Sequence, residues 1–163
     1  MDAHQLSDQF LKSIDQIENA KDGKWTFNEF KTPRGVEARN GFLDACSELF
    51  VPFIGQPKPL ICAAICDALR QRGSHYAVQC YAGMVLLNLV PDAYGQIDEL
   101  IDLVAPVFNV SNREIPAFLV EQVGLEPLLR KIKARKTGAP SELARRLDGI
   151  AYQAEIYQNS KAR

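Results

Sequence analysis

The chain has 163 residues, of which 47% are hydrophobic and 24% are charged, and its net charge at pH 7 is −1. A chain of this length fits one domain and can bury a core without disulfides or a structural metal. The composition excludes wholesale disorder, because disordered chains combine low hydrophobicity with high net charge. We therefore expect one helical domain over residues 1–163.

The sequence predicts a cytoplasmic protein. Residues 1–13 carry acids where a secretory signal needs bases, and they lack a continuous apolar run. The most apolar stretch, residues 76–90, is shorter than the roughly 20 residues that span a bilayer. In a chain large enough to make its own core, cysteines are expected to be reduced thiols. They are Cys46, Cys62, Cys66 and Cys80.

The first third of the chain predicts two helices joined by an irregular aromatic segment. Apolar residues recur every three or four positions from Leu6, which indicates an amphipathic helix ending near Gly23. Residues 24–31 have no helical period, and we expect their aromatic side chains to lie either in the core or at an interface. A second helix is predicted from Thr32, the N-cap before a proline, to about Phe50. The aromatic residues of the connection are Trp25, Phe27 and Phe30.

A proline-rich break over residues 52–59 precedes two further predicted helices. The third spans residues 60–72, and Gly73 ends it. The fourth spans residues 76–89, with Ser74 as its cap. It has few polar interior positions, so we expect neighbours on most of its sides. Its clearly polar interior residues are Gln79 and Asn88.

The last third predicts four more helices. The fifth opens at Asp92, and Pro106 ends or kinks it because proline lacks a backbone donor. Ser111 and Glu114 have capping-box spacing and predict the start of the sixth helix. The seventh spans residues 127–136. The eighth is capped by Ser141 and reaches Gln158, before a frayed tail at 159–163. Gly124 ends the sixth helix and Gly138 follows the seventh.

These elements predict an all-α fold, a compact bundle of about eight helices packed as antiparallel hairpins. No segment alternates apolar and polar residues as a strand would. Residues 1–31 are expected to pack on a helical core of residues 32–158. The helix pairs have a period in the thirties, in which residues 58–158 resemble HEAT or armadillo-type repeats. That resemblance implies a short α-solenoid as the alternative architecture.

Short catalytic motifs for nucleotide binding or hydrolysis are absent from the sequence. His4 is expected on a mobile terminus, and His75 is expected in solvent at a helix start. Cys62 and Cys66 lie one helical turn apart, which with His75 and Cys80 suggests zinc. However, His75 and Cys80 are about 140° apart around one helix. We therefore predict cysteines that pack the core, and no metal or cofactor.

Charge is segregated along the sequence. Residues 92–126 contain seven acids and one base, and residues 127–146 contain seven bases and one acid. One interpretation is that neighbouring helices satisfy each other's charges. The other is that one or both charged faces steer a charged partner.

From these features we predict a non-catalytic protein-interaction module, such as an adaptor, a chaperone-like subunit or a cognate inhibitor. In general character it resembles bacterial toxin-neutralising immunity proteins. The alternatives are an enzyme without a short motif that uses a pocket between helices, and a nucleic-acid binder that uses the basic segment 130–146. We expect another protein as partner, and neither nucleic acid nor a membrane. The predicted contact residues are Asp98, Glu99, Asp102, Arg130, Lys133 and Arg135.

Overall fold

The protein is an all-α helical bundle, as predicted. The computed structural model describes residues 1–19, 47–90 and 95–162, and no strand occurs among them. The helices are α1 Ala3–Asn19, α3 Lys58–Arg72, α4 Tyr76–Leu89, α5 Ile97–Val104, α6 Glu114–Val123, α7 Leu125–Lys136 and α8 Ser141–Lys161. Residues 47–50 are also helical and lead into the 3₁₀ turn η2, Val51–Phe53, and a second such turn, η3, Ala105–Val107, follows α5.

Some predicted features lie outside the described residues. They are the aromatic connection with Trp25, Phe27 and Phe30, the helix start at Thr32, Cys46, and the helix start at Asp92. Residues 95 and 96 form a turn, and α5 begins at Ile97, later than the predicted opening at Asp92; its end agrees with the prediction. Pro106 lies in η3, directly after the last residue of α5.

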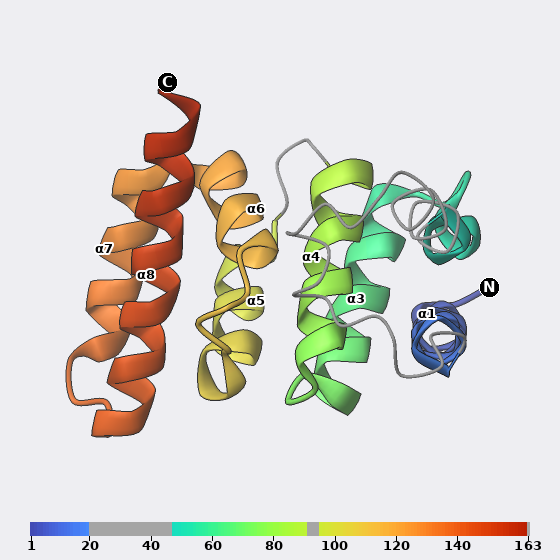
Figure 1. The fold of residues 1–163 in the computed structure, drawn as a ribbon, viewed down its shortest axis with the longest axis horizontal. Helices are drawn as coiled ribbons and strands as arrows, with labels where there is room; N and C mark the ends of the chain where they lie inside the picture. Colours follow the sequence, from blue (N-terminus) through green and yellow to red (C-terminus); the bar gives the residue numbers. More distant parts are fainter. Residues whose placement is uncertain (20–46, 91–94, 163) are drawn as a thin grey trace, which may run out of the picture.

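The helices follow one another in a row, with the N-terminal helix at one end and α8 at the other (Figure 1). α1 packs on α3, α3 and α4 form one hairpin, and α7 and α8 form another. Between the hairpins, α6 packs on both α4 and α8, while α5 packs on α3. The row therefore has two layers, one made by α4, α6 and α8 and one made by α3, α5 and α7.

α4 is a central helix of the described part, as its apolar sequence predicted. It packs on α3 on one side and on α6 on the other. Tyr81 within it is fully buried. Its buried residues are Ala77, Val78, Gln79, Cys80, Tyr81, Ala82, Gly83, Val85 and Leu86.

Gly83 sets the distance between α4 and α6. A Cβ atom at this position would lie 2.5 Å from Cβ of Glu114 and 2.7 Å from the backbone nitrogen of Ile115. Only a residue without a side chain permits this approach. The close packing offsets the roughly 1 kcal/mol that glycine costs inside a helix relative to alanine.

The predicted capping box at the start of α6 is shifted by one residue. Oδ1 of Asn112, and not the hydroxyl of Ser111, accepts a hydrogen bond of 3.1 Å from the backbone N–H of Ile115. The carboxylate of Glu114 accepts from the backbone N–H of Arg113 at 3.1 Å. The reason is a turn in which the N–H of Asn112 bonds to the carbonyl of Asn109, so that the asparagine faces the free helical amides.

Two other predicted serine caps are not formed. The N-cap residue of α4 is His75, one residue after Ser74, and its side chain makes no cap hydrogen bond. The N-cap residue of α8 is Pro140, and Ser141 is the first helical residue. The predicted ends of helices at Gly73 and Gly124 are confirmed, and Gly124 has a positive φ of 81°.

Both ends of the described chain are tied to neighbouring helices. His4 lies in α1, where its Nδ1 is 3.0 Å from Oδ2 of Asp67 in α3, so its predicted place on a mobile terminus is wrong. α8 continues through Lys161, beyond the residue at which fraying was expected to begin. Nζ of Lys161 lies 2.5 Å from Oε1 of Glu121 in α6.

Among the described residues, no single helix is long and apolar enough to cross a membrane. The bent pair Ser47–Phe53 and Lys58–Arg72 meets the length and composition criteria only when taken together, across a bend of 118°.

Candidate protein-recognition surface

The acidic residues of α5 lie on its outer side because its apolar face is used by the core. Asp98 and Asp102 are one turn apart and are exposed, while Glu99 is half-buried. The buried residues of this helix are Ile97, Leu100, Ile101 and Val104, as predicted. The acidic groups are thus placed between the basic residues of the two helices that flank α5 in its layer.

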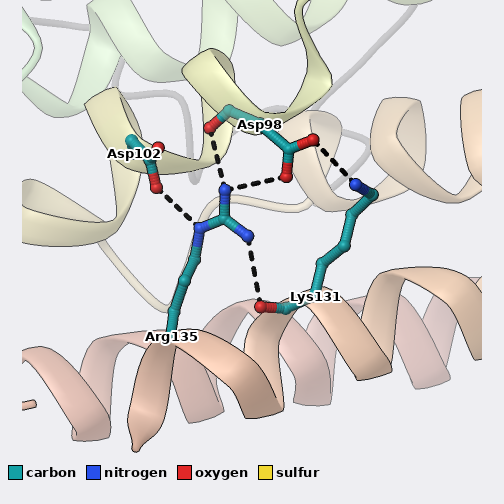
Figure 2. A network of polar contacts seen from close by, with 4 residues as sticks. All are labelled: Asp98, Asp102, Lys131 and Arg135. Carbon is teal, nitrogen blue, oxygen red and sulfur yellow. Dashed lines mark hydrogen bonds and ion pairs between the residues drawn. The ribbon is translucent and has the colours of Figure 1, made fainter. Parts of the chain in front are cut away.

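Arg135 of α7 binds both aspartates of α5 (Figure 2). Its Nε donates to Oδ1 of Asp102 at 2.6 Å, and its Nη2 donates to Oδ1 of Asp98 at 2.8 Å and to the Asp98 carbonyl at 3.2 Å. Its Nη1 donates to the carbonyl of Lys131 at 3.2 Å, and Nζ of Lys131 donates to Oδ2 of Asp98 at 2.7 Å. Each nitrogen of the guanidinium therefore donates at least one hydrogen bond within the molecule.

These contacts favour the charged forms of the groups involved. Hydrogen bonds from Lys131 and then Arg135 hold the pKa of Asp98 below its usual range. Hydrogen bonding to Asp102 and then Asp98 raises the pKa of Arg135. Charge-assisted hydrogen bonds of this kind are stronger than neutral ones. The network therefore fastens α5 to α7.

Glu99 faces the other neighbour of α5 and pairs with Arg70 of α3. The acidic helix thus bonds to a base on each side, since its two aspartates bind α7 and its glutamate binds α3. Four of the six predicted contact residues are used in this way. They are Asp98, Glu99, Asp102 and Arg135.

The remaining two predicted residues, Arg130 and Lys133, are exposed on α7. Neither forms an ion pair with any residue in the described ranges 1–19, 47–90 and 95–162, whereas the other bases of the segment do. They lie three positions apart, so they project from neighbouring points on one helical face. The paired bases are Lys131 with Asp98, Arg135 with Asp98 and Asp102, Lys136 with Asp148, and Arg145 and Arg146 with Glu142.

Lys133 borders an open groove of about 340 Å³ between α7 and α8. The groove has apolar and polar sides, and Lys136 and Asp148, which form an ion pair, lie on its polar side. Sequence reasoning missed the residues that α8 contributes, which are Asp148 and Ala151. The lining residues are Leu129, Ile132, Lys133, Lys136, Thr137, Asp148 and Ala151.

The cysteines of the described part pack in the core, as predicted. Cys62, Cys66 and Cys80 are buried thiols. Burial raises the pKa of Cys80 to about 12, so its thiol is protonated and a weak nucleophile at neutral pH. His75 is exposed, and its Nε2 lies 3.7 Å from Oε2 of Glu18. Its side chain is not grouped with the three cysteines. Within the described residues no group of three or more His, Cys, Asp or Glu side chains is placed to hold a metal.

Comparison of the chain with protein-family models, with curated proteins and with solved structures gives no match.

Proposed function

We propose that this protein is a non-catalytic protein-recognition module, an adaptor or an inhibitor of the toxin-neutralising kind. The observation that supports this proposal is that Arg130 and Lys133 of α7 are exposed and form no ion pair with any described residue, and that Lys133 lines the α7–α8 groove. The neighbouring bases of the same segment are engaged by internal carboxylates. The basic side of α7 is therefore the contact surface, and the acidic residues of α5 act inside the fold.

The cations of α7 differ in which internal contacts a partner must displace in order to bind them. A partner carboxylate that binds Arg130 or Lys133 breaks no internal ion pair. One that binds Arg135 must first displace Asp98 and Asp102, and leaving such groups unpaired costs free energy. Exposed charges at an interface rim raise association rates and reject like-charged partners. A steering role therefore suits the two unpaired cations.

The two alternative classes have less support in the geometry. A nucleic-acid site neutralises several phosphates with a cluster of free bases, yet five bases of this segment already pair with carboxylates. An enzyme needs an activated group in a pocket. The thiol of Cys80 is buried in the core and protonated, and Asp148 in the groove is paired with Lys136.

The test is affinity capture from the native host's lysate with three baits: the wild type, the double reversal Arg130→Glu with Lys133→Glu, and a control. The control, Lys12→Glu with Arg113→Glu, reverses two other exposed bases and so has the same net charge. We expect wild type and control to retain one protein after nuclease treatment. The double reversal should retain at least about tenfold less of it.

Two results would contradict the proposal. One is a recovered protein whose amount is equal on all three baits, which would place recognition elsewhere. The other is retention of nucleic acid in place of protein. Circular dichroism of each bait checks that the reversals leave the helical fold intact.

A further inference from the structure

We infer that the α7–α8 groove binds a segment of a partner protein that carries a carboxylate next to an aliphatic side chain. This inference rests on the proposed function and adds to it the chemistry of the partner. Three features of the groove carry it: its size, its apolar floor and the sign of its rim charge.

The floor is apolar and comes from both helices. Ile132 is 2% exposed, and Leu129 and Ala151 are half-buried and accessible from the groove. The volume of about 340 Å³ lies at the lower end of the range of ligand pockets. A groove of this size takes one or two side chains of a longer segment. Covering the half-buried aliphatic surface is favourable in proportion to the apolar area removed from water.

The rim is basic. It holds two lysines and one aspartate, and because Lys136 pairs with Asp148, Lys133 is the rim charge that has no ion-pair partner among the described residues. Arg130 does not line the groove, but it lies one turn earlier on the same helix and is a second exposed cation. Charge complementarity therefore selects an acidic occupant, with its carboxylate towards α7.

Asp148 adds a direction to this arrangement. It lies on the α8 side of the groove and is paired with Lys136, so the unpaired positive charge of the groove is that of Lys133 on the α7 side. The acidic side chain of the partner is thus directed to Lys133 and its aliphatic side chain to Leu129 and Ala151. A phosphate would use only the rim and leave the apolar floor in water, so the combination favours a protein segment over nucleic acid.

The test uses a phage-displayed library of random 12-residue peptides selected on the full-length protein. We expect the enriched peptides to carry Asp or Glu adjacent to Leu, Ile, Val or Met. Their affinity, measured by fluorescence anisotropy, should fall at least about tenfold with Lys133→Glu. Exchanging the peptide's acid for lysine should restore binding to Lys133→Glu and abolish binding to the wild type.

A second pair of variants tests the apolar floor. Leu129→Lys should weaken every enriched peptide, because it places a charge on the surface that the aliphatic side chain covers. Ile54→Lys is the matched control, since this exposed isoleucine lies in the turn after η2 and outside the groove. It should leave the affinity unchanged.

The inference is overturned if no peptide is enriched, if the enriched peptides lack acids, or if Lys133→Glu binds them as well as the wild type. It is also overturned if inorganic phosphate or an RNA oligonucleotide displaces them at concentrations at which chloride does not. The proposed function fails separately. If capture from lysate depends on Arg130 and Lys133 while the selection fails, the recognition module stands and the groove is not its site.

Discussion

Gln79 is fully buried in the most apolar helix of the described chain, and its amide joins three segments. Nε2 donates to the carbonyl of Gly73 at 2.7 Å and to that of Val107 at 2.8 Å. Oε1 accepts from the backbone N–H of Asn109 at 3.2 Å. The side chain thus connects the α3–α4 turn to the chain after η3. The sequence shows Gln79 as a polar residue inside an apolar helix. Its partners could not be predicted, because two of them lie about thirty positions away.

Gln79→Leu should lower the free energy of unfolding by about 2–4 kcal/mol, because it leaves buried backbone groups without hydrogen-bond partners. Urea denaturation followed by circular dichroism measures this change. The control is Asn88→Ala on the same helix, where the amide is exposed and, within the described residues, bonds to the carbonyl of Met84. Its effect should stay within about 0.5 kcal/mol. If both variants lost the same free energy of unfolding, the hydrogen bonds of the Gln79 amide would not stabilise the fold.

At the scale of elements, the acids of α5 and the bases of α7 lie in one layer, whereas the acids of α6 and the bases of α8 lie in the second layer. The sequence showed which helices carry each charge, but pairing depends on which helices lie side by side. Arg135 faces α5 and forms ion pairs with its aspartates, whereas Lys133, two positions away, forms no ion pair with a described residue. The same dependence explains why the groove was missed, since its two walls come from different helices.

Some helix ends are determined by the local sequence, and others depend on contacts with residues distant in the sequence. The bounds of α4 agree with the sequence prediction of 76–89, because a long apolar run lies between Gly73 and Pro91. The start of α6 does not follow the predicted box, because a turn at Asn109 presents Asn112 to the helix. The sequence predicted Ser111 as the cap, and Asn112 takes this place where the chain approaches α4. Tyr76 of α4 donates to the carbonyl of Ser111 at 3.3 Å.

Arg135→Gln should lower the free energy of unfolding at pH 7 by about 0.5–1 kcal/mol, a small value because the aspartates are exposed. The folded-state pKa of Asp98 is depressed, so its contribution is present above the unfolded pKa of about 3.9. It is lost as the pH falls through the folded-state pKa. Urea denaturation between pH 7 and pH 2 should therefore show wild type and variant converging at the acid end.

The matched control for this variant is Lys133→Gln on the same helix. It removes one positive charge without breaking an internal ion pair, so its stability should follow that of the wild type across the same pH range. A constant difference between Arg135→Gln and wild type down to pH 2 would contradict a role for the Asp98 carboxylate. High salt should reduce the difference at pH 7.

At the scale of the whole molecule, the row of helices means that packing is mostly between neighbours along the row. α1 packs mainly on α3, whereas α8 packs on α6 and α7. Phe10 of α1 is fully buried and lies edge-on to Phe53, with 5.5 Å between the ring centroids. Ile150 of α8 is fully buried at the opposite end. In structures whose units contact mainly their neighbours, one part can unfold locally while the rest stays folded.

Phe10→Ala should therefore accelerate amide hydrogen exchange in α1 and α3 and leave the protection of α7 and α8 near that of the wild type. Ile150→Ala should do the reverse. Mass spectrometry of exchanged peptides under native conditions measures both. Loss of protection spread evenly over all described helices in either variant would show instead that the row unfolds as one cooperative unit.

The contacts between neighbouring helices differ along the two layers of the row. In the layer of α3, α5 and α7, exposed ion pairs join α5 to both neighbours in addition to the buried side chains. In the layer of α4, α6 and α8, the close approach at Gly83 joins α4 to α6, and the ion pair of Lys161 with Glu121 joins α8 to α6. Salt screens the exposed ion pairs that join α5 to α3 and α7. A rise in ionic strength therefore weakens the links of α5 to its two neighbours and leaves the contact of α4 with α6 at Gly83 in place.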